Sequence, residues 1–375
     1  MNESWEYKKI GDVCAVERGG SPRPIDKFIT DDEDGINWIK IGDTSDSMYI
    51  TGTAQKIIPE GMKKSRYVKP GDFLLSNSMS FGRPYILKID GCIHDGWLAL
   101  RDDNELFDKR FLYYYLSSKT TYEKFKSMAV GGVVNNLNSE MVRKVEVPVP
   151  SKDEQSDIAD LLDKVKKILD SRKEELSLLD DLIKARFVEM FGDLASPECL
   201  WNKRKLIEIC VDKDDIKCGP FGTQLSKDEY MESGIAVWEI PQINTAFKSR
   251  PVHFITSEKA EQLKAYTIIP GDIAMSRKGN VGKCAIFPEN YPAGIIHSDV
   301  LRIRLNSQLV NPMFVMCQLH FSGAVTRQIE LVSSGAIMAG VNVTKLKQIY
   351  VHVPPIELQN QFADFVRAVD KSKVA

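Results

Sequence analysis

The sequence has few of the residues that disulfide-stabilised, zinc-binding and membrane proteins depend on. Its 375 residues include seven cysteines, which are scattered without a Cys-x-x-Cys pair. We therefore expect no disulfide framework and no structural metal, and a reducing cytoplasm fits this composition. No apolar run reaches the roughly 20 residues that a membrane helix needs. The first residues lack the basic and apolar regions of a signal peptide, so we expect a cytoplasmic protein.

An excess of charge of one sign is also absent, and so are the common catalytic motifs. The 50 Lys and Arg residues nearly balance the 52 Asp and Glu residues, giving a net charge of -2. Any contact with nucleic acid must then come from local patches or from a basic partner. The sequence contains no Walker lysine motif, HExxH or GxSxG. ATPase, nuclease and hydrolase activities would therefore need partner proteins, and we expect no catalytic residue or cofactor in this chain.

The sequence does contain a long internal repeat. Matching residues recur at spacings of 200 to 204, among them Gly131 and Gly335, Asn138 and Asn342, Pro150 and Pro354, His94 and His297, and Pro70-Gly71-Asp72 and Pro270-Gly271-Asp272. A repeat of this length predicts one scaffold present twice. The sequence between these anchors differs almost everywhere, so we expect a shared core whose different loops bind two different targets.

The Pro-Gly-Asp triplets are turn signals, because Pro presets its φ and Gly adopts conformations that other residues resist. Short apolar runs follow them, and we expect strands at 73–75 and 273–275. A further helix is expected from Phe107 to Phe125. Its Tyr113-Tyr114-Tyr115 run fits a core position better than a base-stacking platform.

The segment from Ser151 to Met190 predicts a long helix. Its apolar positions alternate in steps of four and three, which is a heptad seam suited to pairing with another helix. The seam contains Ile158, Leu162, Val165, Leu169, Leu176, Leu179, Ile183 and Met190, with Arg172 and Arg186 at its remaining positions. Ser151 with Glu154 forms a capping box, and Gly192 and Pro197 mark the end. Such a helix is roughly 60 Å long.

A shorter copy of this helix begins after Pro355, carries Phe362 and Val366 on its apolar face, and stops at Ala375. We expect it to run antiparallel to the first helix as an intramolecular spacer; a coiled coil that dimerises two chains is the alternative. The fold class is then mixed α/β (α+β), with two similar domains joined by long antiparallel coiled-coil helices. The expected boundaries are 1–150, 151–193 (central helix), 194–353 and 354–375 (short C-terminal helix).

This order of domain, helix, domain, helix resembles the specificity subunit of type I restriction–modification enzymes. The Val-x-Val-Pro entries to the two helices at 147–150 and 351–354, Gln155 with Gln359, and the Pro-Gly-Asp turns carry the resemblance across essentially the whole chain. It implies that each domain is a target recognition domain for one half of a bipartite DNA sequence. It also implies that the helices set the gap between the halves and dock methyltransferase subunits, two in the family pattern. The short last helix departs from that pattern.

The resemblance also implies which partners hold the cofactors. The methyltransferase (M) subunits bind S-adenosylmethionine and methylate adenine, whereas the restriction (R) subunits use ATP and Mg. This chain would recognise double-stranded DNA in the resulting complex without catalysing a reaction itself.

Polar loops at matching places in the two copies are the candidate DNA contacts. Glycines there permit close approach of the backbone, and Arg, Lys, Asn, Gln, Ser and Thr suit base edges or phosphates. The candidates are Arg18, Ser21, Arg23, Asn77, Ser80 and Arg83 in the first copy, and Lys217, Thr223, Gln224, Arg277, Lys278, Asn280 and Lys283 in the second. The alternative is that these loops are ordinary turns and solvated hairpins.

Other features have a structural and a functional interpretation. The segments 131–136 and 333–337 could form a third contacting loop or only connect a helix to a strand. His94 and His297 recur, but no carboxylate recurs at a fixed place beside them, which favours a structural role.

Two rival functions remain open. Asn311-Pro312-Met313-Phe314 is close to the Asn-Pro-Pro-aromatic motif of amino-methyltransferases. The first copy has no equivalent motif, which favours a helix start instead. The other rival is a non-catalytic scaffold whose paired domains bind proteins.

Overall fold

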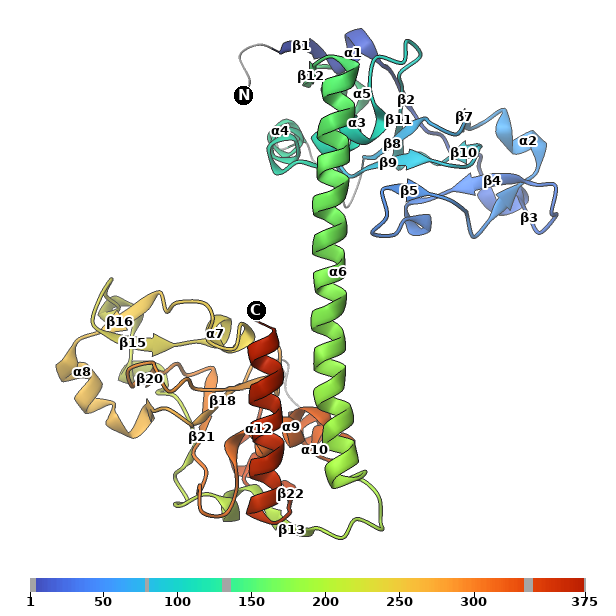
Figure 1. Cartoon of the computed structure of the whole chain (residues 1–375). Coiled ribbons are helices and arrows are strands. Elements are labelled where there is room, and N and C mark those ends of the chain that lie inside the picture. The colour runs from blue at the N-terminus through green and yellow to red at the C-terminus, as the bar shows by residue number, and fades with distance from the viewer. Residues whose placement is uncertain (1–4, 78–80, 130–135, 334–339, 374–375) are drawn as a thin grey trace. The chain divides into compact units, whose positions relative to one another are not determined.

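The computed structural model describes residues 5–77, 81–129, 136–333 and 340–373, except for the side chain of Thr223. Two compact units make up the chain, Met1–Ser171 and Arg172–Ala375. Figure 1 shows β-sheets and a group of helices in each unit. The mixed α/β class predicted from the sequence is therefore confirmed.

Unit 1 (Met1–Ser171) contains two sheets and a separate antiparallel strand pair. The central sheet has the order β2-β11-β8-β9-β5, with bounds Ala15–Arg18, Trp97–Arg101, Phe73–Ser76, Pro84–Leu87 and Tyr49–Ile50. The outer sheet has the order β3-β6-β4-β10-β7, with bounds Ile29–Thr30, Lys56–Ile57, Ile36–Ile39, Gly91–Ile93 and Arg66–Val68. The remaining pair is β1 (Glu6–Lys9) with β12 (Glu146–Val149).

Unit 2 (Arg172–Ala375) repeats this plan. Its central sheet has the order β14-β21-β18-β19, with bounds Ile216–Cys218, Val300–Ile303, Ile273–Ser276 and Cys284–Ile286. Its outer sheet has the order β16-β15-β20-β17, with bounds His253–Ile255, Ile235–Trp238, Gly294–Ile296 and Thr267–Ile268. The separate pair is β13 (Asn202–Lys205) with β22 (Tyr350–Val353). Strand order thus confirms the internal repeat.

The helices also correspond between the units. Unit 1 has α1 (Ile10–Val13), α2 (Pro59–Met62), α3 (Lys109–Ser117), α4 (Lys119–Ala129) and α5 (Ser139–Arg143). Unit 2 has α7 (Ile240–Asn244), α8 (Ser257–Gln262), α9 (Pro312–Phe321), α10 (Gly323–Ser333), α11 (Val343–Leu346) and α12 (Ile356–Ser372). The helix α6 (Lys152–Phe191) belongs partly to each.

The single helix predicted for 107–125 was wrong, because two helices occupy this segment. Ser118 has an extended conformation, with φ -65° and ψ 147°, which ends α3. Its hydroxyl then accepts the Thr121 N–H at 3.2 Å and so caps α4. The three tyrosines pack, partly buried, against the core, as expected.

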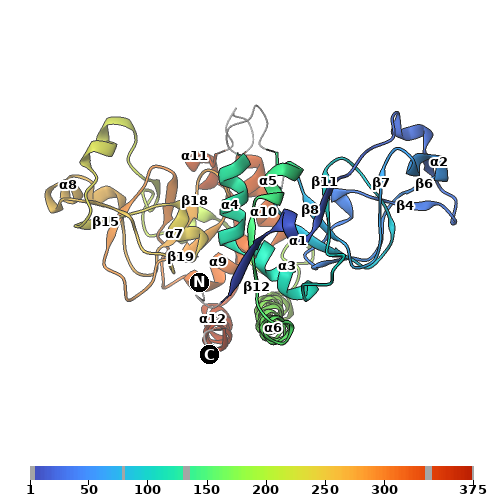
Figure 2. The ribbon, with the colours of Figure 1, turned by 90° about the horizontal axis from the view of Figure 1, so that it is seen from above.

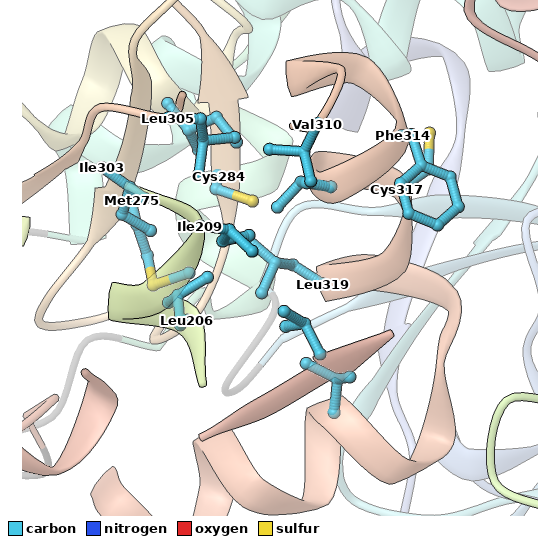
Figure 3. Packing of buried hydrophobic residues seen from close by; sticks show 14 of the residues in the cluster. Leu206, Ile209, Met275, Cys284, Ile303, Leu305, Val310, Phe314, Cys317 and Leu319 are labelled. Atoms are coloured by element: carbon cyan, nitrogen blue, oxygen red, sulfur yellow. The ribbon is translucent and has the colours of Figure 1, made fainter. Parts of the chain in front are cut away.

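Each central sheet is buried on both faces, and successive strand residues point alternately to the two sides. In β8, Phe73 and Leu75 pack toward the helices of unit 1, whereas Leu74 packs with residues of the outer sheet. In β18, Ile273 and Met275 face the helix side, and Ala274 faces the other. Figure 3 shows the helix-side cluster of unit 2, where Met275 and Ile303 lie near Leu206 and Ile209. Both units are therefore layered as helices, central sheet and outer sheet.

The Pro-Gly-Asp turns fix the start of the central strands. Gly71 and Gly271 have φ of 93° and 86°, a conformation that favours glycine. The Asp272 carboxylate is 3% exposed and lies 2.7 Å from Arg304 Nη2. In unit 1, Asp72 lies 3.3 Å from Arg101 Nε. The strands predicted after both turns are confirmed as β8 and β18.

The long helix begins and ends as predicted. Ser151 Oγ donates to Glu154 Oε2 at 2.9 Å, and the Glu154 N–H donates back to Ser151 Oγ at 3.3 Å. Gly192 follows the helix with φ 74°. Within unit 1, the buried Gln155 amide accepts the Asp108 N–H at 2.7 Å and donates to Pro150 O at 2.9 Å. Glutamine at this position therefore ties the start of α6 to the globular part.

The same tie holds α12 in unit 2. Gln359 is fully buried, accepts the Asn311 N–H at 2.9 Å and donates to Pro354 O at 2.7 Å. The C-terminal part of α6 and α12 lie side by side in Figures 1 and 2. The Phe187 ring of α6 contacts the Phe362 ring edge-to-face, with the centroids 5.4 Å apart, whereas Asp180, earlier in α6, binds Lys373 at 2.7 Å. The contacts run in opposite directions along the two helices, so the predicted antiparallel pairing is confirmed. Across the described residues, no helix is both long and apolar enough for a membrane span.

Candidate nucleic-acid interface

The candidate loops of each unit meet where neighbouring strands of its central sheet end. Strand β11 is antiparallel to both β2 and β8, with Leu98 opposite Arg18 and Trp97 opposite Ser76. The loops that follow β2 and β8 therefore lie beside the turn that precedes β11. In unit 2, β21 has the same neighbours, β14 and β18, and the same loops converge. We call the two groups of loops the unit 1 loop surface (residues 18–23, 77 and 94–96) and the unit 2 loop surface (residues 217–224, 277–278 and 297–299).

Glycine is required where the first loop crosses each surface. A Cβ at Gly19 would lie 2.1 Å from His94 O, and one at Gly219 would lie 2.3 Å from His297 O. Real Cβ atoms do not approach that closely, so any other residue would push the loop away. This shared environment makes Gly19 and Gly219 equivalent positions. Ser21 of unit 1 therefore corresponds to Phe221 of unit 2.

Asp95 is the centre of the unit 1 loop surface. Its Oδ1 accepts a hydrogen bond from Ser21 Oγ at 2.8 Å, and its Oδ2 lies 3.7 Å from Arg23 Nη2. Its carbonyl accepts from Arg18 Nε at 3.2 Å. The Ser21 hydrogen bond, with smaller effects of His94 and Arg18, lowers the pKa of Asp95 below its usual value. The ionised carboxylate thus attracts Arg23, which stays largely exposed, while the main-chain carbonyl of the same residue binds Arg18.

The other candidates of unit 1 lie apart from this cluster or beneath it. Asn77 is 2% exposed, and its amide donates to Asp95 O at 2.8 Å, so it supports the loop from below. Arg83 is exposed and lines a hollow between the β8–β9 connection and the helices α3 and α4, together with Phe81 and Tyr122. Ser80 and the segment 131–135 lie outside the described residues.

An exposed aromatic ring is the main feature of the unit 2 loop surface. The Arg277 guanidinium carbon lies 4.8 Å from the centroid of the Phe221 ring, a cation–π contact. Beside it, Lys278 Nζ lies 2.8 Å from Asp299 Oδ1. Arg277 is equivalent to Asn77. The two loop surfaces therefore differ in chemistry at the two positions that are Phe221 and Arg277 in unit 2.

Gln224 and Lys217 extend the same surface. Gln224 Oε1 accepts from the Phe221 N–H at 3.3 Å and from the Tyr266 hydroxyl at 3.0 Å. Lys217 Nζ lies 5.8 Å from the Tyr266 ring centroid. The structure therefore connects Lys217, Gln224 and Arg277 through Phe221 and Tyr266, and Lys278 adjoins them as the next residue after Arg277. This is a basic patch interleaved with aromatic rings, of the kind used by nucleic-acid-binding surfaces.

The remaining candidates of unit 2 lie elsewhere. Asn280 and Lys283 line a hollow formed with α9 and α10, where His320 and Glu330 are also found. This hollow corresponds to the one that contains Arg83. The backbone of Thr223 is in a short 3-10 helix (Gly222–Gln224), whereas its side chain and the segment 334–337 are outside the described part.

The recurring histidines stabilise turns. His94 Nδ1 accepts the Gly96 N–H at 2.7 Å, and His297 Nδ1 accepts the equivalent Asp299 N–H at 3.2 Å. Burial lowers the pKa of His94, which keeps its ring neutral. Both histidines thus shape the turn before the central strand, as the structural interpretation expected. Asn311 likewise caps α9 by accepting the Met313 N–H at 2.9 Å, which supports a helix start.

Four residues that position the side chains of these surfaces were not predicted from the sequence: Asp95, Phe221, Tyr266 and Asp299. Asp95 and Asp299 follow the recurring histidines at different spacings, so comparison of the copies obscured them. The exposure of Phe221 could have been predicted from the local sequence, because an aromatic residue between Pro220 and Gly222 in a turn is poorly placed to join a core. No cluster of three or more metal-ligating side chains occurs in the described ranges.

The predicted helix seam is buried at its ends and open in the middle. Within unit 1, Ile158 packs on the core, Leu162 is half-buried, and Val165 and Leu169 are 44% and 57% exposed. In unit 2, Leu176 is half-buried, Leu179 packs against the core, and Ile183, Phe362 and Val366 are buried. Near the C-terminal end of α6, the buried face consists of Ile183, Phe187 and Phe191. These residues are four positions apart, so they lie on one side of the helix, and that side packs on the globular core.

Comparisons with known proteins agree with this architecture. The family described as type I restriction modification DNA specificity domain matches residues 2–179 and 200–375. Relatives include the type I restriction enzyme MjaVIII specificity subunit of Methanocaldococcus jannaschii, 20% identical over 98% of this chain and 86% of the relative. The EcoBI specificity subunit of Escherichia coli is 22% identical over 99% of this chain and 80% of the relative.

Solved structures share the fold. The type I restriction–modification S subunit from M. genitalium has a TM-score of 0.54 at 16% identity, covering 99% of this chain and 91% of that one. A chain from work on the complex assembly and conformational transition of the type I restriction–modification system has the same TM-score and identity, covering 100% and 92%.

Proposed function

The chain belongs to the family of type I restriction–modification DNA specificity subunits, which are non-catalytic, and from this premise we propose how it recognises its target. Each unit contacts one half of an asymmetric, bipartite DNA sequence through its loop surface. The observation that carries the proposal is the pair of equivalent loop surfaces with different side chains. One scaffold places both surfaces at the same strand ends, whereas Ser21 and Asn77 in one copy are replaced by Phe221 and Arg277 in the other.

We assign the functional parts of the chain by the boundaries that its sequence predicts. Residues 1–150 and 194–353 act as target recognition domains, and 151–193 and 354–375 act as the helices that set the gap. Within the loop surfaces, the exposed cations Arg18 and Arg23 and the half-buried Lys217, Arg277 and Lys278 contact phosphates and base edges. The hollows lined by Arg83, Asn280 and Lys283 give a second, smaller set of candidate contacts.

The open part of α6 is the proposed docking site for methyltransferase subunits. Leu161, Val165, Ile168 and Leu169 are each at least 44% exposed within unit 1. Contiguous apolar surface on a soluble protein usually marks an interface. In the complex, two M subunits, by analogy with the family, bind S-adenosylmethionine, and R subunits use ATP and Mg.

Single-molecule methylome sequencing tests this function directly. A host that expresses this chain with its methyltransferase partner is compared with a host that lacks the chain. We expect a new methyladenine motif with two defined blocks and an unspecified gap of fixed length. No new motif, in cells where the complex is shown to form, would refute the proposal and favour a protein-binding scaffold.

Changes at the unit 2 loop surface test the assignment of one half-sequence to one unit. In the Arg277→Ala, Lys278→Ala double variant, recognition of one block is expected to weaken while the other block is unchanged. Both side chains are partly exposed, so folding is preserved. Equal loss at both blocks, or no loss, would contradict the assignment.

A further inference from the structure

Phe221 has an apolar ring, and its exposure to water is energetically unfavourable. It is 49% exposed, and within the described ranges it is the only phenylalanine or tryptophan among the large exposed apolar side chains. Leaving such a ring in water forgoes the free energy of burying it. An isolated exposed apolar residue is common, but this one lies at the centre of a basic loop surface. Its position there suggests a ligand that covers it.

The loop holds the ring in one place. The Gly219 N–H donates to Val300 O at 3.1 Å, and Gly222 has φ 56°. The Phe221 N–H is held by Gln224, which Tyr266 anchors in turn. Arg277, which lies over the ring, donates from Nε to Val341 O at 3.4 Å, and its backbone N–H donates to Asp299 O at 2.9 Å. The ring is therefore preorganised, so little conformational entropy is lost when it binds.

The Arg277 guanidinium covers one face of the ring, which leaves the other available. A wedge inserted between two base pairs needs both of its faces free to stack. A ring with one free face is better suited to contact at the edge of a base pair. The apolar group that base edges present in the major groove is the 5-methyl group of thymine, and phenylalanine is among the residues that contact it.

We propose that Phe221 recognises the methyl group of one thymine in the half-sequence bound by unit 2. The inference rests on the proposed function and adds a residue and a chemical group to it. Unit 1 has no such contact at the equivalent position, because Ser21 has a hydroxyl that is bound to Asp95. The two units thus differ in kind at this point, with an apolar contact in one and a polar, charged cluster in the other.

Replacing thymine by deoxyuridine removes the methyl group and leaves base pairing unchanged. The full chain in complex with its methyltransferase partner is titrated by fluorescence anisotropy with duplexes that carry its methylation motif. Each thymine of both blocks is substituted in turn. We expect one position, in the block that the Arg277 and Lys278 changes weaken, to lose affinity by about fourfold. This corresponds to about 0.8 kcal/mol at about 1.4 kcal/mol per tenfold, the value of one buried methyl group.

The variant Phe221→Ala should bind both duplexes with the same affinity at that position, and Phe221→Leu should keep part of the difference. Tyr350→Ala is the matched control, because Tyr350 is 48% exposed on β22 and lies outside the loop surface. It should behave as the unchanged protein does. Thermal unfolding of each variant checks that the fold is kept.

Two outcomes overturn the inference and are distinguishable from each other. Specific binding that is insensitive to every thymine substitution, or equally sensitive with and without the Phe221 ring, refutes the methyl contact alone. Absence of any sequence-specific binding by the unchanged complex refutes the proposed function, and the inference with it.

Discussion

Lengthening α6 in its open middle should change the gap between the two recognised blocks without changing the blocks. The best position for an insertion is between Lys164 and Arg172. In this stretch Val165, Ile168 and Leu169 are exposed, and Lys166 forms a surface ion pair with Asp170 at 2.9 Å. Seven inserted residues therefore disturb neither hydrophobic core.

The size of the effect follows from helix geometry. A heptad adds about 10 Å at about 1.5 Å per residue, which corresponds to about three base pairs at about 3.4 Å each. Seven residues also fall only about 20° short of two full turns, so the helix faces keep nearly the same orientation. The expected result is a methylation motif with both blocks unchanged and a gap longer by about three base pairs, or fewer if the complex bends the DNA.

Methylome sequencing of the insertion variant provides the measurement. The control is the same heptad inserted between Ile183 and Phe187, where it would separate two residues of the unit 2 core and abolish recognition. An unchanged gap combined with altered blocks would refute the idea that helix length sets the spacing. Loss of folding after insertion in the open middle would instead contradict the conclusion that this stretch lies outside both cores.

Five further substitutions test the packing and the electrostatics of the two units. Phe187→Ala should destabilise the chain by about 3 to 5 kcal/mol, because the ring is 2% exposed among Phe314 and Phe362, whereas Val188→Ala, at a 50% exposed position, should cost about 0.5 kcal/mol or less. Urea unfolding compares the two, and equal effects would contradict the packing of α6 on unit 2. Asp272→Asn should cost about 3 kcal/mol by leaving Arg304 unpaired, and Asp72→Asn should cost less because its ion pair is longer; the reverse order in thermal unfolding would count against this. Burial lowers the pKa of His352, so the unfolded chain takes up a proton that the folded chain does not, and stability should fall as pH drops below about 6.5. His352→Leu should reduce this slope between pH 7.5 and 5.5, and an unchanged slope would exclude His352 as a source.

Local signals in the sequence were enough to predict much of the scaffold. The capping box of Ser151 and Glu154 and the glycine after Phe191 gave both ends of α6 to within a residue or two. The Pro-Gly-Asp turns predicted β8 and β18, because a turn and the apolar run after it are determined by neighbouring residues. The break at Ser118 was missed, since the hydrophobic pattern continues through it and only the backbone conformation separates α3 from α4.

The composition of each loop surface could not be predicted in this way, because it depends on the tertiary structure. The sequence placed Arg18, Ser21 and Arg23 in one loop and Asn77 in another, but the order β2-β11-β8 decides that these loops meet at Asp95. The same topology buries Asn77 and directs Arg83 to a separate hollow.

The sequence by itself therefore determined that one scaffold occurs twice, with a long helix between the copies, and this order with its recurring motifs was sufficient to suggest the family. Only the tertiary structure decided which polar side chains share a surface and which support it from beneath. The physical reason is that turns, caps and helical periodicity depend on residues a few positions apart. Contacts such as that of Phe221 with Arg277 instead depend on how strands distant in the sequence pair within a sheet.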